Sequence, residues 1–244
     1  MRLKSMLANT ISNYPALFRV ASRTYHKLNP SFRPLSSMSQ GSPYALSQAF
    51  QKAKDLNPLE MGDYYEFGLY RGYTFWYAQN VCGQLGISDT HFYGFDSFQG
   101  LPPIKGIDRL HGQFFKGQFA CSKAEVINNL TKRGIDWSRA TLIDGFFDKT
   151  LTEDINKQYD CKEVAVALID CDLYSSTRDV LTWLASLLTD NSILLFDDWY
   201  AYGKIPELGQ QRAFQEFLNT NKQFSAEPFI EFQYHGASFI LHMT

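Results

Sequence analysis

The sequence predicts an α/β protein with a mostly parallel β-sheet and helices on both of its faces. Two short apolar runs, 164–169 and 193–196, are continuous and bounded by polar residues, which is typical of buried parallel strands. Strand and helix patterns alternate over most of the chain. The length of 244 residues, 45% of them hydrophobic, suits one good-sized domain.

Five parallel strands are expected first, over residues 64–68, 91–96, 140–143, 164–170 and 192–197. Two further strands, 229–234 and 237–242, are separated by His235 and Gly236 and are expected as an antiparallel pair at the sheet edge. Between the fourth and fifth strands, Ser176 and Asp179 predict a capping box at the start of a helix. Other helices are expected over 45–56, after Gly72, over 123–133 and over 209–220.

Acidic residues stand where the fourth and fifth strands end: Asp170 and Asp172, then Asp197 and Asp198. A strand, helix, strand unit of this kind returns the chain parallel, so both strands end on the same side of the sheet. The converging carboxylates would raise one another's pKa values unless a cation lay among them. Oxygen ligands favour Mg²⁺, Mn²⁺ or Ca²⁺ over zinc or copper. The pattern therefore predicts a divalent-metal site.

A glycine turn follows the first strand. Glu66, Gly68 and Gly72 form an E-x-G-x-x-x-G pattern that leads into a helix, and Asp96 ends the second strand. Glycine lets a ligand approach the main chain, and an acid at this separation can accept hydrogen bonds from ribose hydroxyls. The middle glycine of pyrophosphate sites is missing, so the pattern favours S-adenosylmethionine. In the structural alternative, the glycines allow close helix packing and Asp96 caps a loop.

Four stretches of sequence carry a resemblance to a known family. Residues 66–72, 94–102, 168–177 and 196–200, with Arg212 and Ala213 beyond, resemble in order the macrocin O-methyltransferase (TylF) family. Its members are class I S-adenosylmethionine-dependent enzymes that methylate sugar hydroxyls of natural products. The resemblance covers about Gly62 to Phe217 and does not include the segment before it. It implies a Rossmann-like class I methyltransferase fold with a seven-stranded, mostly parallel sheet and an antiparallel terminal strand.

The resemblance also implies roles for individual residues. Asp170, Asp197 and Asp198 would hold Mg²⁺ or Mn²⁺, and Asp172 would be the general base; alternatively, Asp172 caps the turn after it. His111, His235 and His242 are expected to be structural rather than catalytic. Asp144 and Gly145 either border the cofactor or form a turn. The residues expected to bind S-adenosylmethionine are Glu66, Gly68, Tyr70, Arg71, Gly72, Asp96, Ser97, Asp144, Gly145 and Asp170.

The expected reaction is metal-assisted O-methylation of a hydroxyl on a sugar or a glycosylated small molecule. An aliphatic hydroxyl is too weak an acid to be a nucleophile at neutral pH, and a divalent cation lowers the pKa of an oxygen that it binds. Asp172 could then accept the proton as the oxygen attacks the sulfonium methyl group. Two alternatives stay open: a catechol-type O-methyltransferase acting on an aromatic vicinal diol, and a non-catalytic S-adenosylmethionine- or metal-binding module.

The composition and charge of the chain limit its possible partners and its cellular location. The net charge of -2 and the pI near 6.2 argue against nucleic-acid binding. No apolar run reaches the ~18 residues of a membrane span, and four cysteines without metal or disulfide spacing suit the cytoplasm. Residues 1–58 form a basic N-terminal segment whose first acid is Asp55, ahead of a methyltransferase domain over 59–244. We expect this segment to be an arm, a lid or an oligomer contact, and the protein to be a homo-oligomer.

Overall fold

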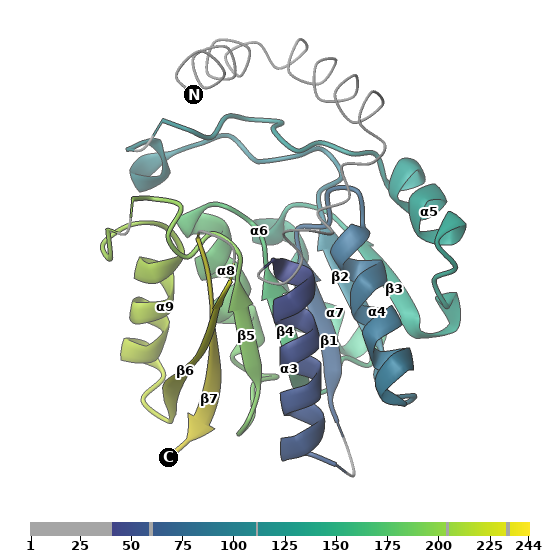
Figure 1. Ribbon diagram of the computed structural model, residues 1–244. Coiled ribbons are helices and arrows are strands. Elements are labelled where there is room, and N and C mark those ends of the chain that lie inside the picture. Colours follow the sequence, from purple (N-terminus) through teal and green to yellow (C-terminus); the bar gives the residue numbers. More distant parts are fainter. Residues whose placement is uncertain (1–40, 59–60, 111, 204, 233–234) are drawn as a thin grey trace.

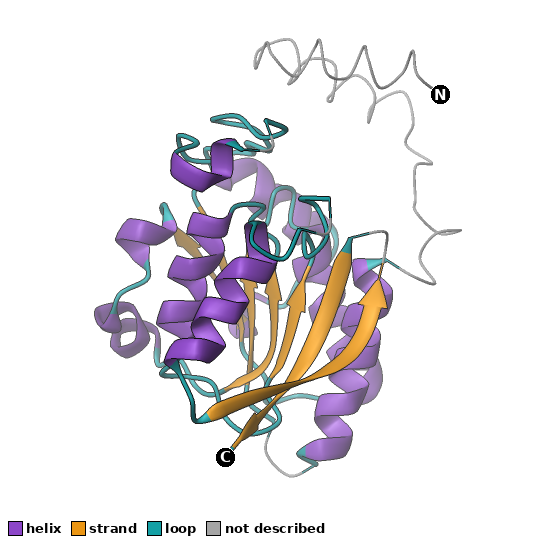
Figure 2. Ribbon diagram, turned by 90° about the vertical axis from the view of Figure 1, so that its left-hand side faces the viewer, coloured by secondary structure: helices purple, strands orange, loops and turns teal. Residues whose placement is uncertain are grey.

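The chain folds around a seven-stranded sheet with helices on both faces. The computed structural model describes residues 41–58, 61–110, 112–203, 205–232 and 235–244. The strand order is β3-β2-β1-β4-β5-β7-β6. Strands β1 to β5 are parallel, and β7 pairs antiparallel with both β5 and β6. Figure 1 shows α3 and α4 in front of the sheet, and Figure 2 shows helices on either side of it. The predicted fold class is confirmed.

The elements follow the predicted alternation of strand and helix. The strands are β1 (Asp63–Phe67), β2 (Phe92–Asp96), β3 (Ala140–Asp144), β4 (Val164–Ile169), β5 (Ile193–Phe196), β6 (Phe224–Phe232) and β7 (Gly236–Met243). The α-helices of the described chain are α3 (Ser42–Leu56), α4 (Tyr73–Leu85), α5 (Lys123–Lys132), α6 (Phe147–Thr150), α7 (Glu153–Tyr159), α8 (Tyr174–Leu184) and α9 (Gly209–Thr220). Two short 3₁₀ helices are η1 (Gly106–Arg109) and η2 (Trp137–Arg139).

Each face of the sheet carries its own hydrophobic core, because successive side chains of a strand point to opposite faces. In β4, Val166 and Leu168 belong to the core that includes α3 and α4. Ala167 and Ile169 belong to the core that includes α8 and α9. All four side chains are fully buried. Burial on both faces explains why this strand is a continuous apolar run in the sequence.

The helix after β4 begins earlier than the sequence predicts. α8 starts at Tyr174 and has no side-chain cap from its own N-terminal residue, so the predicted capping box at Ser176 and Asp179 does not form. Instead, the carboxylate of Asp108 in η1 accepts hydrogen bonds from the backbone N–H groups of Tyr174 (2.8 Å) and Ser175 (3.3 Å). A carboxylate at this position satisfies free amides and interacts favourably with the helix dipole. The cap comes from a distant loop that local spacing does not reveal.

The edge strand β6 also begins earlier than predicted, at Phe224 rather than at residue 229. Pro228 lies within it, and the pairing with β7 shifts register between Pro228 and Glu231. Proline lacks the N–H that a central strand needs, but an edge strand or a bulge tolerates it. The proline therefore conceals the first half of the strand from a pattern-based prediction.

The described part of the basic N-terminal segment is helix α3, which packs on the sheet. Leu46, Ala49 and Phe50 are fully buried in the core shared with α4. The ring centroid of Phe50 lies 5.5 Å from that of Tyr64 in β1. Residues 1–40 lie outside the described part of the chain, so the boundary after residue 58 and the role of the segment stay predictions. Among the described helices, none has the length and apolarity of a membrane span.

Replacing Phe50 with alanine should lower the free energy of unfolding by about 3 to 4 kcal/mol, because it removes a fully buried ring. Urea unfolding followed by circular dichroism measures this change. Gln51→Ala is the matched control, since Gln51 is exposed on the same helix, and should change the free energy by less than about 0.5 kcal/mol. Equal effects of the two substitutions would show that α3 lies outside the cooperative core.

Candidate active site

A cavity of about 930 Å³ opens beyond the ends of the parallel strands. Ligands bind at this rim in open α/β sheets. Glu66 is fully buried in β1, and Arg71, Gly72 and Asp144 are not among the residues that line the cavity, so their predicted contacts with a ligand stay predictions. The other predicted site residues line it: Gly68, Tyr70, Asp96, Ser97, Gly145, Asp170, Asp172, Asp197 and Asp198.

The loop between β1 and α4 needs glycine at two positions, for different reasons. Gly68 has a φ of +95°, and an added Cβ would collide with the carbonyl oxygen of Asp170 beyond β4. Gly72 has a φ of +78°, and an added Cβ would press on Leu130 and Val126 of α5. Gly68 therefore lets two loops meet at the cavity wall, whereas Gly72 allows α4 to begin close against α5.

Asp96, at the end of β2, holds this loop in place. Its Oδ2 accepts hydrogen bonds from the backbone N–H groups of Leu69 (2.7 Å) and Tyr70 (3.1 Å), and its Oδ1 accepts one from Phe98 (2.6 Å). Tyr70 and Phe98 have φ values of +45° and +52°, which bulky residues keep only where the surroundings fix them. Because a carboxylate offers roughly four lone-pair sites, about one is left for a ligand hydroxyl.

The four predicted carboxylates lie beyond β4 and β5 at the same rim. The backbone N–H of Asp170 donates to a carbonyl of β1 (2.9 Å), and that of Asp197 donates to a carbonyl of β4 (3.2 Å), so the sheet ladder extends to both residues. Asp172, with a φ of +62°, donates its backbone N–H to Oδ2 of Asp198 (3.1 Å). The structure thus brings all four side chains to one cavity.

Burial and mutual repulsion oppose the ionisation of these carboxyl groups. Burial, followed by repulsion from neighbouring carboxylates, raises the pKa values of Asp170 and Asp172 well above the usual range. Burial and the charge of Asp197 raise the pKa of Asp198 to about 7. Burial also raises the pKa of Asp197. This arrangement favours the binding of protons or of a cation by the four acids.

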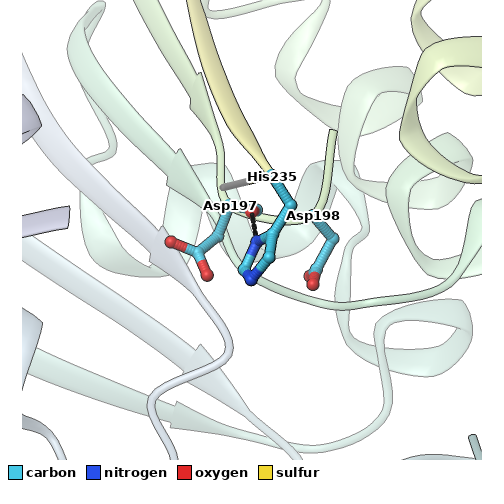
Figure 3. A group of neighbouring side chains, drawn as sticks. All are labelled: Asp197, Asp198 and His235. Atoms are coloured by element: carbon cyan, nitrogen blue, oxygen red, sulfur yellow. Dashed lines mark hydrogen bonds between the residues drawn. The ribbon is translucent and has the colours of Figure 1, made fainter. Parts of the chain in front are cut away.

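His235 lies beside Asp197 and Asp198, with one ligand atom of each residue within 4.8 Å of those of the other two. Figure 3 shows its imidazole ring between the two carboxylates. A positive charge on this ring would lower the pKa of both acids. Asp170 and Asp172 line the same cavity but are not members of this close group. His235 reaches the site because β7 runs antiparallel to β5 and so begins at the rim where β5 ends.

Two further side chains position the aspartate pair, and sequence analysis identified neither. Ser42, at the start of α3, donates a hydrogen bond from Oγ to Oδ1 of Asp197 (2.7 Å). Gln210 of α9 is fully buried; its Oε1 accepts from the backbone N–H of Asp198 (3.0 Å), and its Nε2 donates to the carbonyl of Ile169 (2.9 Å). Neither residue belongs to a local motif, so only the packing of the helices on the sheet reveals their roles.

Glu66 supports the site from within the sheet. Tyr64 and Thr74 donate hydroxyl hydrogen bonds to its two oxygens (2.6 and 2.5 Å). Burial raises the pKa of Glu66 to about 8, although both hydrogen bonds lower it. At neutral pH the side chain is therefore largely protonated, and it adds little negative charge next to the four aspartates.

Comparison with known proteins identifies the family. The model of the macrocin-O-methyltransferase (TylF) family matches residues 48–238, well over half of the chain. The chain belongs to the TylF family. The resemblance predicted from the sequence is confirmed, and the match begins within α3, upstream of the Gly62 expected from the motifs.

Two curated proteins are similar to this TylF-family chain over part of their length. Mycinamicin III 3''-O-methyltransferase of Micromonospora griseorubida is 27% identical over 145 residues, which cover 57% of this chain and 55% of the relative. The 8-demethyl-8-(2,3-dimethoxy-alpha-L-rhamnosyl)-tetracenomycin-C 4'-O-methyltransferase of Streptomyces olivaceus is 28% identical over 146 residues, which cover 57% and 53%. The chain spans about half the length of the curated relatives it matches.

Solved structures share the fold of this TylF-family chain. The O-methyltransferase NovP superposes with a TM-score of 0.66 at 23% identity, covering 82% of this chain and 80% of NovP. The calicheamicin methyltransferase CalS11 gives 0.66 at 22% identity, covering 81% of this chain and 77% of CalS11. These identities are low, so the likeness supports the fold and not a shared substrate.

Glu66→Gln should flatten the dependence of stability on pH in this TylF-family protein. The folded protein keeps the Glu66 proton up to about pH 8, whereas the unfolded chain loses it near its ordinary pKa of 4.5. The folded state therefore binds more protons between these values, and the contribution of Glu66 to stability is lost as pH rises through 8. Between pH 5 and 8.5, wild-type stability should fall relative to the variant by up to about 4 kcal/mol.

Urea unfolding at a series of pH values measures this difference. Glu153→Gln is the control, because Glu153 is exposed on α7 and should leave the pH profile unchanged. Parallel profiles for wild type and Glu66→Gln would mean that Glu66 ionises normally.

Proposed function

We propose that this protein is an S-adenosylmethionine-dependent O-methyltransferase that requires a divalent cation, Mg²⁺ or Mn²⁺, and acts on a hydroxyl of a sugar or glycosylated small molecule. The observation that carries the proposal is the convergence of Asp170, Asp172, Asp197 and Asp198, two of them buried and two half-buried, on one cavity. The cavity is bordered by residues 68–72 between β1 and α4, here called the Gly68 loop. Membership of the macrocin-O-methyltransferase family supports the reaction. The name of one curated relative, a methyltransferase of a rhamnosyl tetracenomycin, supports a sugar acceptor.

The donor set fits a hard divalent cation. Asp170, Asp197 and Asp198 would hold it, because their carboxyl groups have raised pKa values through burial and, for Asp170 and Asp198, mutual repulsion, and a cation relieves both. Carboxylate oxygens are the ligands that Mg²⁺ and Mn²⁺ accept. When bound, the cation would supply a Lewis acid that makes the acceptor hydroxyl more acidic.

The Gly68 loop and the end of β2 form the proposed cofactor half of the cavity. Gly68, Tyr70 and Ser97 line it, and the Gly68 loop is fixed by two backbone hydrogen bonds to Asp96, which accepts a third from Phe98 after β2. The lone-pair site left on Asp96 could accept a ribose hydroxyl, so its structural role and its predicted binding role are compatible. S-Adenosylmethionine bound here would supply the sulfonium methyl group.

Asp172 is the proposed acceptor of the hydroxyl proton. Its raised pKa makes it a stronger base than an exposed aspartate, and the residue is 9% exposed and lines the cavity. The left-handed backbone and the hydrogen bond from its N–H to Asp198 fix its position. Asp108 already accepts hydrogen bonds from the first amides of α8, which weakens the alternative that Asp172 serves as a cap.

The rest of the cavity suits a ring-shaped acceptor. Phe114 and Phe119 line it together with Leu101 and Pro103, all from the long loop between β2 and α5. Aromatic side chains offer rigid apolar surface for the face of a sugar ring or an aglycone. The nearby aspartates supply polar groups that would orient hydroxyls.

Asp197→Asn should abolish divalent-cation binding and methyl transfer while the fold persists. The substitution removes a proposed ligand charge but keeps an oxygen that can accept the hydrogen bond from Ser42. Calorimetry with Mn²⁺ should show at least about a 100-fold loss of affinity. Loss of a residue that only supports a ligand typically costs about 10- to 100-fold, so a larger loss indicates a direct ligand. Circular dichroism should show no loss of stability in the metal-free protein, because one repelling charge is gone.

The control for Asp197→Asn is Asp148→Asn, an exposed position that also lines the cavity. Methyl transfer is measured on panels of glycosylated small molecules and catechols, before and after treatment with chelator. Full activity after complete metal removal would contradict the proposed cation requirement, and activity on catechols alone would contradict the proposed acceptor.

Asp172→Asn should lower kcat by about 10²- to 10⁴-fold, the usual contribution of a general base, with little change in the affinity for S-adenosylmethionine. Steady-state kinetics and calorimetry on the same preparations separate the two effects. Asp179→Asn is the matched control, because Asp179 lines the cavity but is paired with Arg178. A wild-type kcat in Asp172→Asn would remove Asp172 from the mechanism.

A further inference from the structure

His235 is held at the rim of the sheet by one contact of its backbone and one of its ring. The backbone carbonyl of His235 accepts a hydrogen bond from the N–H of Tyr200 (2.8 Å). Its ring Nδ1 is 2.7 Å from the carbonyl oxygen of Asp197. A carbonyl oxygen only accepts hydrogen bonds, so Nδ1 must carry the hydrogen and donate it. The contact therefore fixes both the orientation of the ring and the identity of the protonated nitrogen.

The other ring nitrogen, Nε2, faces the proposed cation site. In Figure 3 it points into the gap between the carboxylates of Asp197 and Asp198. No residue in the described ranges forms a hydrogen bond with it. The ligand atoms of the three residues all lie within 4.8 Å of one another. Two ligands on opposite sides of an ion, each with a bond of roughly 2.1 Å, are about 4.2 Å apart, so the three atoms are close to the spacing of ligands around one ion.

This is the arrangement in which histidines bind metals. A metal-ligating histidine almost always donates its second ring N–H to a carbonyl or carboxylate, which leaves a lone pair on the nitrogen that faces the ion. The antiparallel pairing of Phe196 with Ala237 holds the end of β5 next to the start of β7, so the three side chains stay together. The ring is thus pre-positioned without any movement of the backbone.

We infer that Nε2 of His235 is a ligand of the proposed cation, together with Asp197 and Asp198, and that it shifts the preference of the site from Mg²⁺ towards a later first-row transition cation such as Fe²⁺ or Co²⁺. Imidazole nitrogen suits transition cations, whereas Mg²⁺ and Ca²⁺ are held by oxygen ligands. The inference rests on the proposed function in one respect, the presence of a cation site. It concerns the identity of the ligands and of the ion, and not the reaction.

The test compares metal binding by wild type, His235→Gln and a control. Full-length protein is stripped with chelator and titrated by calorimetry with MgCl₂, MnCl₂ and CoCl₂. His235→Gln should weaken Co²⁺ binding by at least about tenfold and Mg²⁺ binding by less than about threefold. The diagnostic quantity is the ratio of the Co²⁺ affinity to the Mg²⁺ affinity, compared between wild type and His235→Gln. The ratio is compared, rather than the Co²⁺ affinity alone, because most sites prefer Co²⁺ to some degree. His242→Gln, the same change on the exposed end of β7, should leave the ratio unchanged.

Pulsed electron paramagnetic resonance of the Mn²⁺-loaded protein gives a readout that a structural role would not affect. Wild type should show coupling to a directly bound nitrogen, and His235→Gln should lack it. An unchanged ratio of Co²⁺ affinity to Mg²⁺ affinity in His235→Gln, or no nitrogen coupling in wild type, would overturn the inference. If Asp197→Asn still abolishes metal binding in that case, the proposed function stands and only the role of His235 fails. If wild type binds no cation at all, both fail.

Discussion

The site depends on one constraint, the repulsion among four carboxyl groups that the parallel sheet brings to the same rim. Asp170 and Asp172 follow β4, and Asp197 and Asp198 follow β5. Their raised pKa values express the free energy needed to ionise several buried acids side by side. A protein keeps such a cluster where a cation or a proton-transfer reaction uses it, and both uses are combined in the proposed mechanism.

Elements outside the parallel strands hold the cluster in place. Ser42 of α3 donates to the side chain of Asp197, Gln210 of α9 accepts from the backbone of Asp198, and His235 precedes β7. These contacts come from both helix layers and from the antiparallel edge of the sheet. Each fixes a donor or acceptor at the rim, so the geometry of the carboxylates is set before any ligand arrives. Such pre-positioning is what binding and catalysis at a charged centre require.

The proposed cofactor half and the proposed cation half of the cavity are in direct contact through the backbone. Gly68 passes so close to the carbonyl of Asp170 that no side chain fits between them, and Asp96 ties the same loop to β2. The proposed cofactor loop and the proposed cation site therefore share a backbone contact. A shift in one loop would move the other, which would keep a methyl donor and an acceptor oxygen in register.

The sequence alone determined the succession of strands and helices along the chain, the burial of the central strands on both faces and the aspartates at their ends. Hydrophobic periodicity and local motifs are properties of neighbouring residues, so the sequence carries them directly. Tertiary structure alone decided that Asp108 caps α8, that Ser42 and Gln210 support the aspartates, and that His235 joins them. Each of these contacts joins segments that are distant in the chain, and most depend on which elements pack together. Sequence spacing carries no information about such pairings until the fold brings the segments into contact.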